Sequence, residues 1–348
     1  MAQDKNEIAY KRKDAHLDLA KSDLAKAQIA HPFDKVSLQH HALPDMAMDD
    51  IDVTKRFLSK RLDVPFFIGA MTGGTDRADA INACLAEVAQ ETNIALALGS
   101  QRASLANERD VSYLRKLAPN AVLIGNLGIT QLAQEGGFDM AMRAIDSIEA
   151  NAIAIHLNPL QEAAQPEGDH DWRGVTDALA HFIKQSPVPV IVKEVGAGIS
   201  ASLAAYLGAM GAAYVDIAGL GGTNWTRIEA ARHQSPQQNA ILAPFLDWGI
   251  DTKTAISDAS ALASGTRLIA SGGIRHGLDV AKALALGADM VCAAGPILKS
   301  LESKDGTLSQ DALMDEITIW TEQLRLACFL TNSAKIGDLK GKFQDSSK

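Results

Sequence analysis

Eight short runs of apolar residues recur along the chain, and each ends in glycine or in a cluster of polar residues. A run of consecutive apolar residues is typical of a strand that is buried on both faces, as the strands of parallel sheets are. The segments between the runs, such as ADAINACLAEVAQ and LDVAKALALG, place apolar residues at the spacing of an amphipathic helix. The runs occupy residues 66–74, 94–102, 121–128, 153–162, 190–198, 214–224, 268–275 and 290–296.

This alternation of strands and helices predicts a closed (β/α)8 TIM barrel, an α/β fold, with an N-terminal helical extension. We expect residues 1–60 to form a helical and irregular extension that contributes to substrate binding, and residues 61–348 to form the barrel. The competing fold is a doubly wound open sheet, which usually carries G-x-G-x-x-G after its first strand. The first run, FFIGAMTGG, does not match that motif.

Three segments outside the repeats also have an expected structure. A helix over about residues 5–25 opens the chain, and an amphipathic helix near residues 309–330 closes it. The longest interval between the starts of two runs, 54 residues, separates the sixth run from the seventh. An insertion of this length, centred on residues 224–250, is a candidate lid or a contact between subunits.

The charge balance excludes one class of function. A formal net charge of -9 and an isoelectric point near 5.5 argue against nucleic-acid binding, which usually needs a basic face. The three cysteines lack metal-ligand spacing and suit a reducing compartment. Because the start has no signal-peptide core and no apolar stretch is long enough to span a bilayer, we expect a cytoplasmic protein without a membrane partner.

The polar ends of the runs are expected to meet at one place. In a (β/α)8 barrel the active site lies at the carboxyl ends of the strands, on the loops that follow them. Glycine at one such end is usually a turn signal, but polar residues or glycine follow all eight runs. The set therefore predicts a large ligand surrounded by loops. The endings read MTGG, SQR, NLG, HLNPLQE, KEVG, GLGGTN, SGGIR and AAGP.

The last two endings predict a phosphate site. Barrel enzymes often bind phosphate between the loops after strands seven and eight, with backbone N–H groups as donors. The segments 271–275 and 294–296 supply the glycines that let the backbone approach an anion. Arg275 has two interpretations that stay open, a partner for the phosphate or a structural salt bridge.

Lys193 ends the fifth run, where a lysine in the barrel wall cannot easily reach solvent and needs a partner for its charge. It could form a Schiff base, or it could be a cation beside a flavin ring. Its neighbour Glu194 points to the other side of the strand, which favours a structural role.

The fourth ending, HLNPLQE, supplies an imidazole, two amides and a carboxylate. Mg²⁺ typically takes one or two carboxylates and completes its shell with water and phosphate oxygens, which fits Glu162. In isolation a Gln-Glu pair is more often solvated surface. An anionic substrate would also need a basic group, which Arg12, Lys13 and Arg102 could provide, although the N-terminal run of charges is also typical of a solvated helix.

These motifs together resemble the type 2 isopentenyl diphosphate isomerases, from about residue 10 to residue 335. That resemblance implies an FMN-dependent barrel that interconverts isopentenyl and dimethylallyl diphosphate in isoprenoid biosynthesis. It also implies Mg²⁺, a flavin kept reduced by NADPH, and a homo-oligomer, a tetramer or octamer. The motifs read RKDAH, AMTGG, GSQR, GNLG, HLNPLQE, VKEVGAGIS, GLGGTNW with IEAAR, and SGGIRHGLDVAKALALGAD.

The resemblance also assigns roles to matching positions. Gln161 would contact the isoprenoid as the catalytic side chain, and Glu162 would bind Mg²⁺. The residues that would bind the isoprenoid diphosphate are Arg12, Lys13, Ser100, Gln101, Arg102, His156, Asn158 and Gln161. The residues that would bind FMN are Ala70, Met71, Thr72, Ser100, Asn126, Lys193, Thr223, Gly272, Gly273, Arg275, Ala294 and Gly295.

The isomerisation needs one proton added to an alkene carbon and another removed nearby. The resemblance implies that reduced FMN serves as acid and base through its N5 region. One alternative is an FMN oxidoreductase such as a 2-hydroxy-acid oxidase, which would carry His-Gly-Gly-Arg after the sixth strand, where this chain reads GLGGT. Another is a flavin-binding protein without catalysis, which would leave Gln161, Glu162 and the pair Arg12 and Lys13 without a use.

Overall fold

The computed structural model describes residues 17–19, 22, 25–232, 235–303 and 305–345. Eight parallel strands close into a barrel in the order β10-β11-β4-β5-β6-β7-β8-β9. The predicted barrel and its strand count are confirmed, and the open doubly wound sheet is wrong. The barrel strands are β4 (Phe66–Ile68), β5 (Ala95–Ala97), β6 (Val122–Gly128), β7 (Ala152–His156), β8 (Val190–Lys193), β9 (Tyr214–Asp216), β10 (Leu268–Ala270) and β11 (Met290–Ala293).

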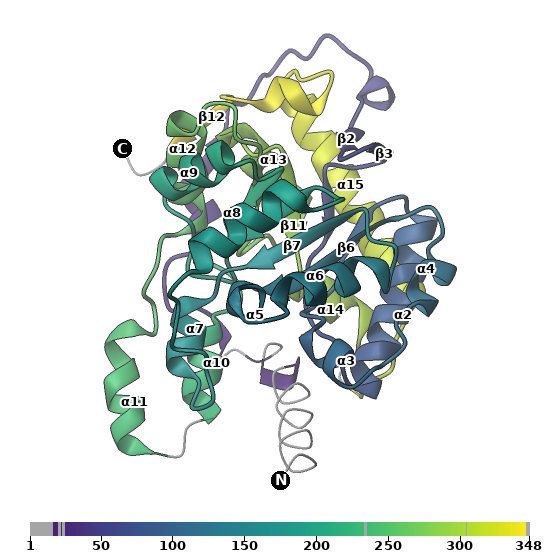
Figure 1. Cartoon of the computed structure of the whole chain (residues 1–348). Coiled ribbons are helices and arrows are strands. Elements are labelled where there is room, and N and C mark those ends of the chain that lie inside the picture. The colour runs from purple at the N-terminus through teal and green to yellow at the C-terminus, as the bar shows by residue number, and fades with distance from the viewer. Residues whose placement is uncertain (1–16, 20–21, 23–24, 233–234, 304, 346–348) are drawn as a thin grey trace.

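Helices cover the outside of the barrel, as Figure 1 shows. Their inner faces pack on the outward-facing residues of the strands and form the larger of two buried apolar clusters. The longer helices that follow the strands are α2 (Asp76–Glu91), α6 (Gly137–Asp146), α8 (Val175–Gln185), α9 (Ala201–Met210), α12 (Thr252–Leu262), α13 (Gly277–Leu286) and α15 (Gln310–Leu330). Short helices lie in the connections: α3 (Arg102–Ala106), α4 (Tyr113–Leu117), α5 (Ile129–Ala133), α7 (Pro159–Ala164) and α14 (Gly295–Leu301).

A two-stranded hairpin closes one end of the barrel. Its strands, β2 (Lys55–Phe57) and β3 (Lys60–Leu62), are antiparallel. Phe57 is fully buried, with its ring stacked 5.4 Å from Phe67 and edge-on 5.0 Å from Tyr214. These rings belong to the second apolar cluster, which fills the barrel interior. Because Tyr214 begins β9, the hairpin closes the barrel at the amino ends of the strands. The carboxyl ends stay open to a ligand.

The insertion between the sixth and seventh strands is helical. It contains α10 (Trp225–Arg232), α11 (Pro236–Leu242) and the 3-10 turn η4 (Ala243–Phe245). Helix α10 packs against α7, whereas α11 extends away from the barrel in Figure 1. Three large apolar side chains in this region are exposed: Ile241, Phe245 and Trp248. The insertion therefore contributes one helix to the barrel mouth and one to the periphery.

The segment before the barrel crosses the loops at the barrel mouth. Ala25 accepts a hydrogen bond from the backbone of Asn224 at 2.7 Å, and Lys26 forms an isolated bridge with Thr223. The 3-10 turn η2 (Pro32–Lys35) follows, with Phe33 fully buried. Strand β1 (Val36–Leu38) then pairs with β12 (Phe343–Asp345) near the C-terminus. Of the helix expected over residues 5–25, only residues 17–19 are described as helical, and most of that segment lies outside the described residues.

The closing helix is confirmed. Helix α15 runs from Gln310 to Leu330, and the side chain of Ser309 caps its start by accepting from the backbone of Ala312. Across the described part of the chain, we find no helix with both the length and the apolar character needed to span a membrane. Two further 3-10 turns, η3 (Met48–Asp50) and η5 (Ile336–Leu339), complete the connections.

Candidate active site

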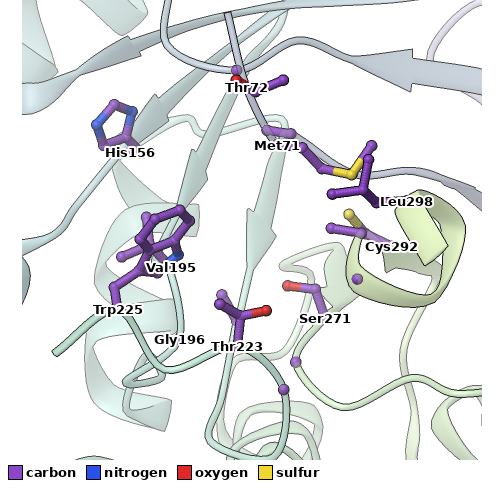
Figure 2. Close-up of a pocket in the computed structure, with 18 of the residues that line it drawn as sticks. Met71, Thr72, His156, Val195, Gly196, Thr223, Trp225, Ser271, Cys292 and Leu298 are labelled. Atoms are coloured by element: carbon purple, nitrogen blue, oxygen red, sulfur yellow. The ribbon is translucent and has the colours of Figure 1, made fainter. Parts of the chain in front are cut away.

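A cavity of about 960 Å³ lies at the carboxyl ends of the barrel strands. A volume of this size suits a cofactor together with a small substrate. Figure 2 shows His156 and Trp225 on one side of it, with Ser271, Cys292 and Leu298 on the other. Apart from Gln101, every predicted site residue that the structure describes lines this cavity.

The order of the strands gives the cavity two opposite ends. In the closed barrel, β10 lies across from β6, and β11 lies across from β7. The loops after β10 and β11 carry the predicted phosphate site, and the loops after β5 and β7, on either side of β6, carry the predicted substrate and metal residues that the structure describes. We call these the glycine end and the amide end.

Backbone atoms form the glycine end. Gly272 and Gly273 have φ of 93° and 82°, conformations that side chains other than glycine rarely adopt. A Cβ atom added to Gly273 would lie 2.8 Å from the carbonyl carbon of Gly221, so the two loops meet backbone to backbone. Within the described chain, the N–H groups of Gly272 and Gly273 donate to no other protein group. Successive unpaired N–H groups of this kind form an anion-binding concavity.

Arg275 is held by two carboxylates. Its guanidinium donates to Asp279 at 2.8 Å and to Asp34 at 2.7 Å. These partners raise the pKa of Arg275 and lower that of Asp34. The structural salt bridge that the sequence left open is therefore present, and Arg275 also lines the cavity. The carboxylates of Asp34 and Asp279 therefore neutralise most of its positive charge in the absence of a ligand.

The wall between the two ends carries Lys193 and Asp216. They are register partners on β8 and β9, so both side chains point into the barrel mouth. Asp216 is 2% exposed and accepts from the hydroxyl of Ser271 at 2.5 Å. Burial raises the pKa of Asp216, and it raises the pKa of the Cys292 thiol, which the nearby Asp216 charge raises further. Cys292 is thus a protonated thiol and not a nucleophile.

Lys193 donates to the carbonyl oxygen of Glu194 at 2.5 Å. The Glu194 carboxylate accepts from the backbone N–H groups of residues 195–198 at 2.5 to 3.1 Å. It therefore fixes the loop that presents Val195 and Gly196 to the cavity, the structural role expected for it.

The amide end starts with His156, the last residue of β7. Its Nδ1 lies 2.7 Å from Oδ1 of Asn126, and the Asn126 amide donates to the carbonyl of Leu98 at 2.9 Å. Because Asn126 offers an oxygen to the ring, Nδ1 of His156 carries the proton. Strand pairing and this hydrogen bond together set the orientation of the imidazole.

Asn158, Gln161 and Glu162 form one network. The Asn158 amide donates to Glu162 at 2.9 Å and to Gln161 at 3.2 Å, and the backbone of Asp169 donates to the other Glu162 oxygen at 2.8 Å. Asn158 is 4% exposed, yet its Oδ1 atom is buried without a hydrogen-bond partner among the described residues. An orphaned buried oxygen on the cavity wall is a site where a ligand or its metal would be expected.

Glu229 is a residue of this network that the sequence did not reveal. Its carboxylate is completely buried and accepts from Gln161 at 3.1 Å and Gln165 at 2.9 Å. Arg232 forms an ion pair with its other oxygen. Both residues lie on α10 in the insertion, within the IEAAR motif, to which no site role was assigned from the sequence. The insertion thus supplies the carboxylate that accepts a hydrogen bond from the Gln161 amide.

Three predicted substrate residues follow β5, and of these Ser100 and Arg102 line the cavity whereas Gln101 does not. Arg102 lines the cavity, and its guanidinium lies 3.6 Å from Asp169. Gln101 points away: it is 3% exposed, donates to Ala144 and Ser147 at 3.0 Å, and accepts from the backbone of Asn126. The structure therefore does not bring Gln101 to the site, because packing between β6 and α6 uses its amide. Arg12 and Lys13 lie outside the described residues.

The donor set suits a hard cation bound through few protein ligands. Among the described residues, no group of three or more His, Cys, Asp or Glu side chains could hold a metal ion. The Glu162 carboxylate and the orphaned Asn158 oxygen are both oxygen donors on adjacent side chains. Mg²⁺ commonly takes one or two carboxylates and obtains its remaining ligands from water and a substrate phosphate.

Comparison with known proteins places the chain in a family. It matches the family model of the FMN-dependent dehydrogenases over residues 159–344. It is 44% identical to the isopentenyl-diphosphate delta-isomerase of Stutzerimonas stutzeri, covering 94% of this chain and 95% of that protein. The isomerase of Pseudescherichia vulneris is 43% identical, covering 97% and 96%.

Among solved structures, a mutant of an active chimera of (S)-mandelate dehydrogenase aligns with a TM-score of 0.68 at 18% identity, covering 99% of this chain and 98% of that one. At that identity the likeness concerns the fold alone. The relatives cover nearly the whole chain at well above 30% identity. This chain belongs to the FMN-dependent dehydrogenase family and, within it, to the type 2 isopentenyl-diphosphate delta-isomerases.

Proposed function

We propose that this protein interconverts isopentenyl and dimethylallyl diphosphate, with FMN at the glycine end of the cavity and the diphosphate at the amide end. The observation that carries the proposal is the network of Asn158, Gln161, Glu162 and Glu229, which faces a glycine-lined anion cradle across the barrel mouth. An anionic cofactor and an anionic substrate thereby have separate sites.

The residues that would hold FMN are those that line the glycine end and the adjoining wall. Unpaired N–H groups of Gly272 and Gly273 suit its phosphate, with Arg275, Ala294 and Gly295 alongside. The rest of the FMN surface comprises Ala70, Met71, Thr72, Ser100, Asn126, Lys193 and Thr223. When bound and reduced, FMN supplies a group near its N5 atom that can give and accept a proton.

At the amide end the chain binds and orients the diphosphate. His156, Asn158, Ser100 and Arg102 would contact its oxygens, and Glu162 would hold Mg²⁺, whose charge would offset that of the diphosphate. Fixing the diphosphate in this way positions the alkene, which lowers the entropic part of the barrier. The N-terminal extension with Arg12 and Lys13 is part of the proposal as a further source of positive charge.

Gln161 is the proposed catalytic side chain beside the hydrocarbon. Its amide nitrogen donates to Glu229, and its oxygen accepts from Asn158, so both ends of the amide are fixed. A fixed amide can hold a charged or polar group of the reaction in place without titrating itself. Glu229 acts through Gln161 as a positioning residue. We propose that NADPH reduces the flavin. We also propose that the protein is a homo-oligomer in the cytoplasm.

An oxidase of 2-hydroxy acids is the function that the fold alone would also allow. Residues 217–224, between β9 and α10, contain no histidine that could serve as base. A noncatalytic flavoprotein would leave the buried Glu229 network without a purpose, although a buried ionic network has a cost in free energy.

Anaerobic incubation of the protein with FMN, NADPH, Mg²⁺ and isopentenyl diphosphate tests the proposal. We expect dimethylallyl diphosphate to form, while NADPH is consumed only to the extent that the flavin is reduced. Absence of dimethylallyl diphosphate would refute the isomerase. Consumption of NADPH in proportion to product would favour an oxidoreductase.

A further inference from the structure

His31 lies at the glycine end of the cavity and belongs to the segment before the barrel. It lines the cavity, and its Nε2 atom would lie 3.0 Å from a Cβ atom added to Gly273. The ring therefore sits directly beside the backbone whose N–H groups form the anion cradle. None of the motifs along the barrel strands indicates this residue.

The position of His31 is fixed by its neighbours. Pro32 and Phe33 are both buried, and Lys282 donates to the Phe33 carbonyl at 2.8 Å. The ring of Pro32 packs against the loop after β9, since a Cβ atom added to Gly221 would meet it at 2.7 Å. The segment is thus anchored on the loops after β9 and β10.

Both ring nitrogens of His31 are buried and make no hydrogen bond of good geometry among the described residues, although the backbone of Gly273 lies close enough to raise the pKa of the ring. The imidazole always carries at least one N–H, and a buried donor without a partner costs free energy. Asp34 does not accept a hydrogen bond from the ring, because Nδ1 of His31 lies 3.9 Å from that carboxylate. The carboxylate of Asp34 already accepts a hydrogen bond from Arg275. The ring is therefore prepared for a ligand that accepts hydrogen bonds.

The surroundings select an anion. The ring lies beside the backbone of Gly273 and within reach of the Arg275 charge, and the carboxylates of Asp34 and Asp279, which also act on the ring, both form ion pairs with Arg275. Burial and the Arg275 charge lower the pKa of the free His31 ring, so the ring is available as a neutral N–H donor at neutral pH. Binding of an anion would favour its protonated form.

We propose that His31 is a ligand for the phosphate group of FMN, which it contacts from the segment before the barrel. The diphosphate of the substrate is the other phosphate in the proposed reaction, but its proposed ligands follow β5 and β7, which flank β6, the strand across the barrel from β10. This inference rests on the proposed function only in taking FMN as the cofactor. It adds a residue outside the barrel to the cofactor site.

Riboflavin lacks only the phosphate of FMN, and it provides the test. Dissociation constants of both flavins are measured by fluorescence quenching with the full-length protein stripped of flavin. His31→Ala should weaken FMN binding about tenfold, the loss expected for a hydrogen bond to a charged group, and change riboflavin binding less than about twofold. His31→Gln retains an N–H donor and should recover part of the loss.

The matched control is His40→Ala, which removes an exposed histidine nine residues along the same segment and should change neither constant. Equal weakening of FMN and riboflavin would show that His31 only packs, and unchanged FMN affinity would also overturn the proposal. A raised KM for isopentenyl diphosphate with unchanged FMN affinity would assign His31 to the substrate instead. Wild-type protein that binds neither flavin would refute the proposed function together with this inference, whereas FMN binding without isomerase activity would refute the function alone.

Discussion

The two ends of the cavity use different kinds of polar group. At the glycine end the donors are backbone N–H groups, exposed because Gly272 and Gly273 carry no side chain and hold positive φ. At the amide end the polar groups are side chains, held by the buried carboxylate of Glu229 and by hydrogen bonds among Asn158, Gln161 and Glu162. The first arrangement suits a phosphate that stays in place. The second suits a substrate that must be oriented and released.

Because of this difference, we expect substitutions at the glycine end to weaken FMN binding and substitutions at the amide end to lower turnover. The glycine end is damaged by adding a methyl group, and the amide end by removing a side chain. Four substitutions test this distinction, because flavin affinity and turnover can be measured separately on the same protein.

Glu162→Ala should have the largest effect. Loss of the metal carboxylate is expected to lower turnover about a thousandfold, since metal assistance is worth several kcal/mol in the transition state. FMN affinity should be unchanged, so the protein stays yellow. Steady-state assays across Mg²⁺ concentrations check this, with the exposed Asp171→Ala on the same loop as control. Full Mg²⁺-dependent activity in the Glu162 variant would remove this residue from the metal site.

Gln161→Ala should lower turnover about a hundredfold, the scale of a positioned group beside the reacting atoms. The FMN affinity should not change, because Gln161 belongs to the amide end. Parallel measurement of turnover and of FMN content in purified protein provides the check. A colourless protein would instead make Gln161 a cofactor residue.

Glu229→Gln should lower turnover about tenfold through loss of the fixed orientation of Gln161. It should also lower the free energy of unfolding by about 2 kcal/mol, because Arg232 loses its buried partner. The double variant with Gln161→Ala should be no slower than Gln161→Ala alone. Additive losses would show that Glu229 acts independently of Gln161. Glu167→Gln removes the other, more exposed carboxylate beside Arg232 and serves as control.

Gly273→Ala should have the smallest effect, and it should appear in FMN affinity. Its φ of 82° and the close approach of Gly221 make an added methyl group unfavourable by about 1 kcal/mol, which corresponds to about fivefold weaker binding. Gly265→Ala is the control, because its φ is 85° but no atom lies within 4 Å of an added Cβ. Isothermal titration with FMN should separate the two. Equal FMN affinity in both variants would contradict the role of the glycine end.

The sequence predicted what local patterns encode. Eight apolar runs indicated eight strands because a strand buried on both faces has no room for polar side chains, and the polar residues after each run could only meet at one end of the barrel. The HLNPLQE segment was found for the same reason. Its polar residues line the cavity together with Lys193 and the two glycine loops.

Residues brought to the site by long-range packing were not predictable in this way. Glu229 lies 68 residues from Gln161, on a helix whose polar residues resemble a solvated face. His31 reaches the cavity through an irregular segment with no periodicity. Gln101 was assigned to the substrate because of its neighbours in SQR, but the chain turns there and directs its amide between β6 and α6. Side-chain direction at the end of a strand depends on that turn.

The central claim is that the two ends cooperate in a proton transfer without net redox change. Its most direct test is product analysis after anaerobic turnover of isopentenyl diphosphate in D₂O with FMN, Mg²⁺ and a known amount of NADPH. We predict dimethylallyl diphosphate that carries solvent deuterium in a methyl group, with NADPH consumption limited to the amount of flavin. Product without deuterium, or NADPH consumed mole for mole with product, would contradict the account.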